Sequence, residues 1–308
     1  MPPAQAPSAP AAERADLVRG VLAHGIAWIL VSEFLFAVMR VATRLGAADL
    51  SGIEIGAVRF LGGAVVAFAI ARSRGASLRV VDQKNAWLRS LFGTANAAAV
   101  FYVLGSERIA VGDVATLSGV GPLFVALLSF PVLRERVSRR VALGAVVGFV
   151  GVAVLVKPVF RLAGDLASLA VAGAFFYALA MLRLRKLGPR ESSEAIAFHM
   201  SLVAGVTLSL LALPHFRVPS RGALLPLAVS VAAGGLAQLA MSRAYALDRA
   251  ARLSALAYAG VVFTYALESL VWGRSPDLRQ WLGAGLVCLS GAVVSWRRPV
   301  PAAPAPGA

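Results

Sequence analysis

The sequence has few charged residues and few of the residues that usually catalyse reactions or bind metals. Only 15% of its 308 residues are charged, and it contains three histidines and one cysteine. A single cysteine excludes an intramolecular disulfide. The sequence also lacks an HExxH zinc pattern, a GxxxxGK[ST] phosphate loop and an aspartate-rich cluster. We therefore expect no enzyme, no catalytic residue, no metal site and no cofactor.

Apolar residues dominate instead and make up 59% of the chain. A soluble domain contains about 45–50% apolar and about 25% charged residues. Here the segments between apolar stretches are too short to supply a polar surface. Most of the apolar stretches reach the roughly 17–25 residues that a membrane-spanning helix needs. The ten predicted spans are 21–41, 50–71, 88–106, 111–133, 141–157, 165–184, 193–213, 223–245, 250–272 and 280–296.

These stretches predict helices. Within a bilayer, backbone groups must be hydrogen-bonded internally, so only helices and closed barrels can cross it. A barrel would need segments of about ten residues that alternate between apolar and polar, and no such alternation occurs. We predict an all-α integral membrane protein with ten transmembrane helices and the lipid bilayer as its partner.

The net charge of +15 does not indicate a nucleic-acid partner, because the basic residues form short clusters between the apolar stretches. Such clusters mark the cytoplasmic side of a membrane. With the N-terminus inside, 20 of the 30 basic residues are cytoplasmic and 8 are external. The pattern predicts a bacterial-type cytoplasmic (inner) membrane with both termini inside. Residues 1–19 and 299–308 are expected to be cytoplasmic tails, the first of them disordered.

The two halves of the chain resemble each other when it is shifted by 141 residues. At this offset Phe34, Arg44, Ser51 and Leu61 fall on Phe175, Arg185, Ser192 and Leu202. We therefore expect one repeat at 20–158 and another at 159–298. An odd number of spans in each repeat forces opposite orientations, and inverted repeats are typical of transporters with a substrate site between the halves.

Residues 101–158 closely resemble the repeat unit of the EamA family in the drug/metabolite transporter superfamily. The similar elements are the helix connection Ser106–Ala110, Pro122, Glu135 and a glycine series at positions 144, 148 and 151. Residues 238–298 resemble a second copy. Phe263 and Arg274 stand there in place of the proline and the glutamate, which speaks against symmetric roles for the two halves.

This resemblance implies a transporter of small metabolites with a central cavity. Helices 1–4 and 6–9 of the ten would line the cavity, and helices 5 and 10 would be peripheral. The glycines of helices 5 and 10 allow close helix packing and offer a surface for a homodimer. Pro122 interrupts the hydrogen bonds of the fourth helix and predicts a kink.

Charged residues within membrane helices are costly and are candidate site residues. Glu33 and Arg40 are two turns apart and share a face of the first helix. They could hold a zwitterion or a coupling proton, or form only an internal ion pair. Arg59 in the second helix could grip a carboxylate or phosphate, or clamp two helices together. Glu33 is a candidate partner for Arg59.

Polar and aromatic residues of later helices complete the candidate substrate site. Tyr258, Tyr265 and Glu268 follow helical spacing in the ninth helix and would form one aromatic face with a carboxylate. The alternative is an aromatic belt at the membrane interface. Asn96 and Gln238 could contact substrate or hydrogen-bond between helices.

The function predicted from these features is secondary transport. A permease or exporter would carry a small polar metabolite by alternating access, driven by a gradient of a coupling proton or an exchanged metabolite. Two other classes remain alternatives. One is a membrane-embedded enzyme acting on a lipid or isoprenoid, and the other is a membrane scaffold that transports nothing.

Overall fold

The computed structural model describes residues 9–46, 50–104, 117–156, 164–273 and 276–295, which form helices and no strand. The helices of the first repeat are α1 (Ala9–Gly46), α2 (Gly52–Arg74), α3 (Gln83–Leu104), α5 (Gly121–Leu133) and α6 (Arg139–Val156). Those of the second are α7 (Gly164–Leu187), α8 (Ser193–Ala212), η1 (Leu213–His215), α9 (Arg221–Leu247), α10 (Ala250–Leu256), α11 (Ala259–Trp272) and α12 (Leu278–Ser295).

Seven helical segments in the described ranges are long and apolar enough to cross a bilayer. They are Gly25–Leu45, Gly52–Arg74, Gly164–Leu187, Ser193–Ala212, Arg221–Leu247, Ala250–Trp272 and Leu278–Ser295. The helix α5 is apolar but shorter. The helices α3 and α6 follow the third and fifth predicted spans, and part of the fourth lies outside the described residues. The all-helical membrane fold with two repeats is thus confirmed.

The helix α1 begins earlier than the sequence predicted. It starts at Ala9, within the segment expected to be disordered, whereas the predicted span began at residue 21. Alanine, glutamate, arginine and leucine are good helix formers, and the segment 11–19 consists largely of them. The apolar pattern marks where a helix enters lipid, and the helix itself continues beyond that point.

The second helix of each repeat starts in the same way. Ser51 and Ser192, which match at the offset of 141, are the N-caps of α2 and α8. Each side chain accepts a hydrogen bond from the backbone N–H three residues later, from Glu54 and Ala195 respectively. Such caps satisfy N–H groups that have no partner within the helix. The repeat seen in the sequence is therefore also a repeat in local structure.

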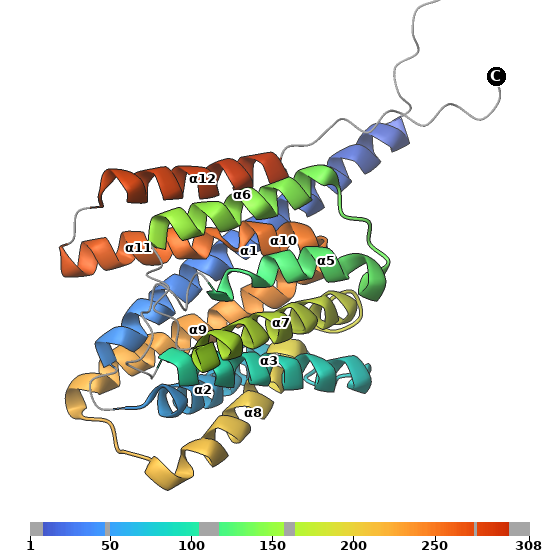
Figure 1. The fold of residues 1–308 in the computed structure, drawn as a ribbon. Helices are drawn as coiled ribbons and strands as arrows, with labels where there is room; N and C mark the ends of the chain where they lie inside the picture. The colour runs from blue at the N-terminus through green and yellow to red at the C-terminus, as the bar shows by residue number, and fades with distance from the viewer. Residues whose placement is uncertain (1–8, 47–49, 105–116, 157–163, 274–275, 296–308) are drawn as a thin grey trace, which may run out of the picture.

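Helices of one repeat pack mainly against helices of the other repeat (Figure 1). The pair α6 and α12 lies along one edge of the bundle, and α2 packs against α8 towards the other edge. Between them, α1 packs on α9 as α7 packs on α3, and α1 packs on α11 as α7 packs on α5. Each contact of one repeat thus has a counterpart made by the other. Two repeats of five spans related in this way have the inverted architecture.

Glycines bring the two edge helices α6 and α12 together. A Cβ atom on Gly144 would collide with Val294, and one on Gly283 would lie 2.5 Å from the backbone nitrogen of Leu155. Ser290 Oγ also donates a hydrogen bond to the Gly144 carbonyl at 2.6 Å. Small residues of this kind permit close helix packing in membranes. These glycines therefore join the two repeats within one chain.

A turn lies within the fourth predicted span of each repeat, next to a described helix. A turn at Gly119–Val120 precedes α5, and a turn at Ala257–Tyr258 separates α10 from α11. Pro122 lies in the first turn of α5, as a helix-interrupting proline would. The second interruption was not predicted, since the sequence indicated one continuous helix over 250–272. Gly260, rather than Phe263, occupies the place in the second interruption that Pro122 occupies in the first.

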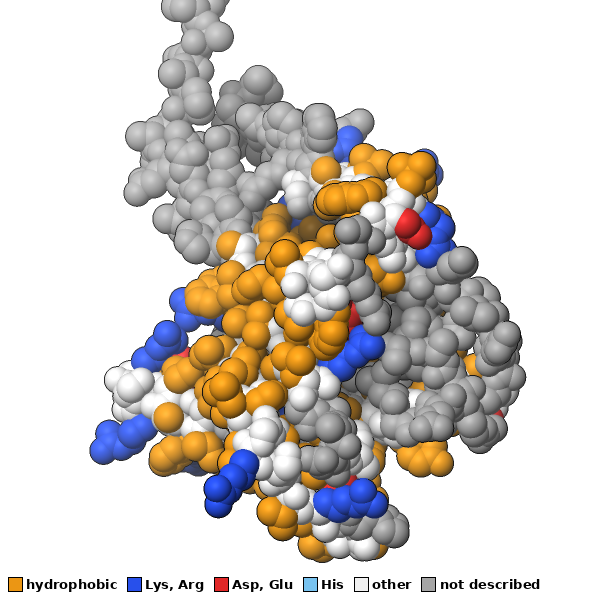
Figure 2. Space-filling view, turned by 90° about the vertical axis from the view of Figure 1, so that its left-hand side faces the viewer, with side chains coloured by type: hydrophobic (Ala, Val, Ile, Leu, Met, Phe, Trp, Pro, Cys, Tyr) orange, Lys and Arg blue, Asp and Glu red, His pale blue; other side chains and the backbone are white. Residues whose placement is uncertain are grey.

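Many large hydrophobic side chains are exposed on the described part of the bundle. Figure 2 looks onto the left-hand side of Figure 1, and on this face hydrophobic side chains cover wide areas between separate basic side chains. Large hydrophobic residues are exposed on both repeats, among them Val65, Leu127, Leu210 and Leu270. In a soluble monomer such surfaces would be unusual, whereas a lipid environment accommodates them.

Candidate functional site

A row of charged residues on α1 faces the second half of the ninth segment, α11. The guanidinium of Arg40 lies 3.5 Å from the Glu33 carboxylate and donates hydrogen bonds to the Gly260 carbonyl and to Thr264 Oγ1 at 3.2 and 2.7 Å. One turn further, Arg44 lies 3.0 Å from Glu268. The structure thus brings together Glu33 and Arg40, and it brings Glu268 to the same helix interface.

The interruption of the ninth segment makes room for Glu33. A Cβ atom on Gly260 would collide with the Glu33 carboxylate, so only glycine fits here without a shift of the neighbour. The side chain of Glu33 is almost fully buried, whereas Arg40 keeps 42% of its side chain exposed. A buried carboxylate is therefore joined to a cation that remains accessible. This pairing is the internal ion pair that the sequence left as an alternative.

Arg59 has no carboxylate partner among the described residues. Its Nε donates to the sulfur of Met39 at 2.7 Å, and its guanidinium carbon lies 4.1 Å from the centre of the Phe60 ring. Sulfur is a weak acceptor, and the ring contact is a cation–π interaction. Glu33, the partner suggested from the sequence, pairs with Arg40 instead. Arg59 therefore lies buried between α1, α2 and α9 with its charge uncompensated by a described carboxylate.

The predicted aromatic face of the ninth helix does not form as a single face. The ring of Tyr258 packs with Val152 of α6 and Val287 of α12, and its hydroxyl donates to the Gly119 carbonyl at 2.8 Å. Gln280 Nε2 of α12 donates to Tyr265 Oη at 3.1 Å. Both tyrosines therefore face the edge helices, while Glu268 faces α1. Tyr265 and Glu268 both belong to α11 and nevertheless contact different helices, which helical spacing alone does not reveal.

Tyr258 instead joins the two interrupted helices. The turn at 119–120 replaces the regular hydrogen bonds of a helix, because Leu123 N–H donates to Val120 rather than to Gly119. The Gly119 carbonyl is thus released and accepts the Tyr258 hydroxyl. One interrupted helix therefore supplies a free acceptor and the other supplies the donor. This bond joins equivalent places in the two repeats.

Asn96 and Gln238 lie on different helix interfaces. The Oδ1 atom of Asn96 on α3 lies 3.7 Å from the position of a Cβ atom on Gly173 of α7. Gln238 on α9 is buried, and its Nε2 is enclosed without a hydrogen-bond partner in the described part of the chain. Ser32 of α1 donates to the carbonyl of Ala237, the residue before Gln238, at 2.9 Å. Gln238 therefore lies at about the same depth in the bundle as Glu33, which follows Ser32.

A second ion pair, at the opposite end of the bundle, corresponds to Arg44–Glu268. Arg185 Nε lies 3.1 Å from Glu135, and Arg185 Nη1 donates to the Tyr245 and Ala246 carbonyls at 3.1 and 3.2 Å. Arg44 and Arg185 match at the offset of 141 and are each third from the end of their helices. Each binds a carboxylate near the end of the fourth segment of the other repeat. The sequence indicated asymmetric halves because Glu268 and Glu135 do not align in register.

We name the two ends by these arginines. The Arg185 end is where α5, α7 and α9 terminate, and the Arg44 end is where α1 and α11 terminate. The Arg185 end also holds a second ion pair, in which Arg252 lies 3.1 Å from the buried Asp248 and donates to the Ser295 carbonyl of α12 at 3.2 Å. Burial raises the pKa of the Asp248 carboxyl, against the backbone N–H of Arg249 and the charge of Arg252. The Arg185 end therefore carries two ion pairs, and at Asp248 burial outweighs the attraction of the neighbouring charges.

Sequence reasoning missed Arg89. It was counted among the cytoplasmic charges because the predicted third span began at residue 88, but α3 begins at Gln83. Arg89 consequently lies more than a turn inside the helix and is only 2% exposed. Gly93 follows one turn later on the same face, and a Cβ atom there would collide with the Arg89 guanidinium. That arginine–glycine spacing was the one signal available in the sequence.

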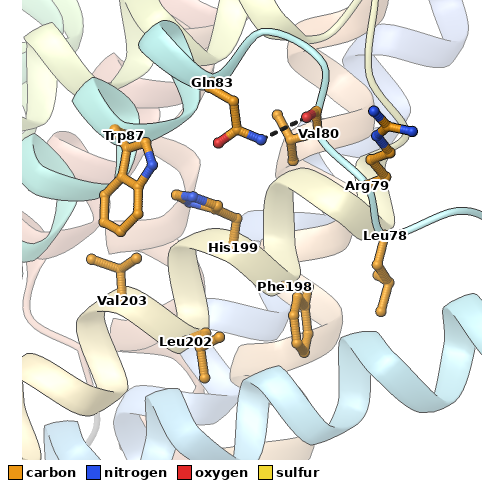
Figure 3. A pocket seen from close by; sticks show the side chains of 9 residues that line it. All are labelled: Leu78, Arg79, Val80, Gln83, Trp87, Phe198, His199, Leu202 and Val203. Carbon is orange, nitrogen blue, oxygen red and sulfur yellow. Dashed lines mark hydrogen bonds between the residues drawn. The ribbon is translucent and has the colours of Figure 1, made fainter.

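A cavity of about 290 Å³ lies elsewhere, between the segment 78–83, α3 and α8. Figure 3 shows Trp87, His199 and Phe198 on its wall, with Arg79 and Leu78 at its side. Its lining includes none of the predicted site residues. We therefore place the candidate site at the charged row and the buried arginines, which lie between the two repeats.

Comparisons with known proteins support this architecture. The profile of the EamA-like transporter family matches residues 23–157 and 166–296. The pseudopaline exporter CntI of Pseudomonas aeruginosa (strain UCBPP-PA14) is 26% identical over 285 residues, which are 89% of this chain and 96% of that protein. The riboflavin transporter of Vibrio cholerae is 25% identical over 280 residues, covering 88% of this chain and 93% of that protein.

One solved crystal structure has the same fold. It superposes with a TM-score of 0.77 at 20% sequence identity and covers 88% of this chain and 96% of its own. At that identity the likeness concerns the fold alone. The family profile, by contrast, matches each of the two repeats found in the structure over nearly its whole length. The chain belongs to the EamA-like transporter family.

Proposed function

We propose that the protein carries a small polar metabolite across a bacterial-type cytoplasmic membrane by alternating access. The observation that supports this most directly is the equivalence of the Arg44–Glu268 and Arg185–Glu135 ion pairs at opposite ends of the bundle. Each pair ties the first helix of one repeat to the fourth segment of the other. Opening one pair while the other stays closed would expose the residues between them to one side at a time.

The charged and polar residues between the two pairs form the proposed substrate site. Glu33, Arg40 and Arg59 provide both signs of charge at the repeat interface, and Gln238 provides an unpaired amide. Charge within a membrane is tolerated where water or an opposite charge is at hand. These residues favour a polar substrate over a lipid. The chain has no ATP-binding loop pattern, so a gradient of a coupled ion or an exchanged metabolite would supply the energy.

The Arg185 end is proposed to face the cytoplasm, with both termini on that side. Clusters of basic residues follow or precede the helices there, including Arg72, Arg74, Arg139 and Arg140. Positive charge in short connections sets this orientation. The relatives named as an exporter and as a transporter of small molecules are consistent with this proposal.

Cysteine labelling tests alternating access without knowledge of the substrate. Thr264, which binds Arg40 between the two ends, would be replaced by cysteine in a Cys288→Ala background. An impermeant thiol reagent should label Thr264→Cys from either side, in right-side-out and in inside-out vesicles. Labelling in only one of the two vesicle preparations would contradict the proposal, because the residue would then be open to one side of the membrane only.

A disulfide at one end provides the matched control. Cysteines in place of Arg44 and Glu268 should, when oxidised, block labelling of Thr264→Cys from the Arg44 end only. Cysteines in place of Arg185 and Glu135 should block it from the opposite end only. Reduction should restore both. Transport itself is measured with proteoliposomes loaded with a metabolite mixture, whose loss is followed by mass spectrometry against empty liposomes.

A further inference from the structure

Arg89 is a buried charge that the ion pairs at the two ends do not use. It belongs to α3 and is one of the largest side chains that the protein encloses almost completely. Its Nη1 donates to the sulfur of Met200 at 3.3 Å, and its Nε is enclosed without a hydrogen-bond partner in the described ranges. A guanidinium carries five N–H donors. A weakly accepting sulfur leaves most of this capacity unused.

No carboxylate compensates Arg89 within the described part of the chain. Arg40, Arg44, Arg185 and Arg252 each lie within 4.0 Å of a carboxylate oxygen, whereas no such pair includes Arg89. A buried charge is tolerated when an opposite charge or strong acceptor meets it. The partly buried Arg185 and Arg252 show how this chain provides such partners. The missing partner of Arg89 therefore points to a group from outside the protein.

Two tyrosines lie beside Arg89 on the opposite repeat. Tyr177 of α7 and Tyr245 of α9 are its electrostatic neighbours. Tyr245 is fully enclosed, and its hydroxyl lies next to that of Tyr177. The Tyr177 ring lies 2.8 Å from the position of a Cβ atom on Gly121, where the interrupted α5 begins. Donors from both repeats thus meet next to the helix break.

We propose that Arg89, with the hydroxyls of Tyr177 and Tyr245, binds an oxyanion group of the transported substrate, a carboxylate or a phosphate. The proposal rests on the proposed transport function and specifies its substrate class. A guanidinium matches the paired oxygens of either anion, and hydroxyl groups add further donors. The Glu33 carboxylate also acts electrostatically on the same two tyrosines. A negative charge of the protein would therefore lie near the bound substrate as well.

The test compares anions with neutral analogues of similar size. Thermal unfolding of the full-length protein in detergent is measured at constant ionic strength. Succinate is paired with succinamide, and glycerol 3-phosphate with glycerol. At least one anion should raise the melting temperature more than its neutral analogue, because a ligand that binds the folded state stabilises it. The anion that succeeds distinguishes carboxylate from phosphate.

Three variants assign the effect to this residue. In Arg89→Met the affinity for the anion should fall by roughly ten- to hundredfold, as expected for the loss of hydrogen bonds to a charged group. Arg89→Lys keeps the charge but loses the paired donors and should retain part of the affinity. Arg79→Met removes an exposed arginine of the neighbouring connection and should leave the affinity unchanged. Without ligand, Arg89→Met should melt no lower than the parent, because it removes an uncompensated charge.

Failure of this site and failure of the transport function give different results. The oxyanion site is overturned if no anion exceeds its neutral analogue, or if Arg89→Met keeps the difference. It is also overturned if both Arg89 variants melt lower than the parent without ligand, since the arginine would then be structural. If anion binding depends on Arg89 but proteoliposomes release no metabolite, the site stands and the transport function fails.

Discussion

The two ends of the molecule use the same kind of ion pair in different surroundings. At the Arg44 end, the side chains of Arg44 and Glu268 are 49% and 26% exposed, and Arg44 also lies over the Trp272 ring. At the Arg185 end, Arg185 and Glu135 are each 21% exposed, and Arg185 binds two backbone carbonyls as well. The ion pair at the Arg185 end is therefore less exposed and makes more hydrogen bonds than the pair at the Arg44 end.

Two inverted repeats can therefore form the same kind of ion pair and still place it in different surroundings within one conformation. Exposed ion pairs contribute only about 0–1 kcal/mol, whereas breaking a buried pair costs about 3–5 kcal/mol because a charge is left unpaired. The Arg185 pair, being half-buried, lies between these limits. If the repeats exchange conformations during transport, the two ends would exchange these surroundings. The residues between the two ends would contact the substrate in both conformations.

The largest effect is expected at the centre, which both ends share. Arg59→Ala should abolish transport while the protein still inserts in the membrane. The fold should persist because the substitution leaves no described carboxylate without its partner. The measurement is metabolite release from proteoliposomes, with membrane content determined by quantitative blotting. Transport at the parent rate with unchanged substrate affinity would remove Arg59 from the site.

The glycine contact between α6 and α12 should have the next largest effect, this time on stability. Gly283→Ala places a methyl group 2.5 Å from the Leu155 backbone nitrogen, where the neighbour is main chain and cannot rotate away. Overpacking of this kind typically costs about 1–3 kcal/mol. The melting temperature in detergent should fall clearly.

Gly285→Ala is the control for this contact, since a Cβ atom there meets open space. Its melting temperature should be no lower than that of the parent, because alanine favours a helix more than glycine does. Gly291→Ala should also be mild, because its nearest neighbour, Leu256, lies at an ordinary contact distance of 3.6 Å. Equal losses in all three variants would mean that the close contact between α6 and α12 does not decide stability here.

The comparison of the two ends gives the third prediction. Arg185→Gln should lower stability by about 1–3 kcal/mol, because it leaves Glu135 and two carbonyls short of a donor. Arg44→Gln should change stability by less than about 1 kcal/mol, since its partner remains hydrated. Chemical unfolding in detergent followed by circular dichroism measures both. A larger loss for Arg44→Gln would mean that the Arg44–Glu268 pair, and not the Arg185–Glu135 pair, contributes more to stability.

Much of the fold could be predicted from the sequence, because lipid imposes simple rules on length and polarity. The offset of 141 residues placed Ser51 and Ser192 at equivalent positions, and both are N-caps. The break before Pro122 follows from the chemistry of proline. The break at 257–258 has no proline, and the apolar pattern continues across it. It could be found only by requiring the second repeat to copy the first.

The site was harder to predict, because the direction of each side chain depends on helices far apart in the sequence. Arg40 and Thr264 are 224 residues apart, and nothing local indicates their hydrogen bond. The sequence identified Glu33 and Arg40 as candidates but suggested Arg59 as the partner of Glu33. Arg89 was missed for a different reason, since an apolar window begins only after the polar first turns of α3. Helical periodicity placed Glu268 on one face with Tyr258 and Tyr265, but Glu268 contacts α1 whereas both tyrosines face the edge helices.

The smallest expected effect concerns pH at the Arg185 end. Burial raises the pKa of Asp248, although Arg249 N–H and the charges of Arg252 and Arg185 oppose the shift. A carboxyl whose pKa is raised by folding favours the folded state most when protonated, and this contribution is lost as the pH rises through the folded pKa. The melting temperature of the parent, relative to Asp248→Asn, should therefore rise as the pH is lowered from neutral towards the ordinary aspartate pKa of about 3.9. Because the other titrating groups are common to both proteins, they largely cancel in this difference. A difference that instead falls with decreasing pH would mean that the pair with Arg252 outweighs burial, so that the contact at this end is held by charge attraction.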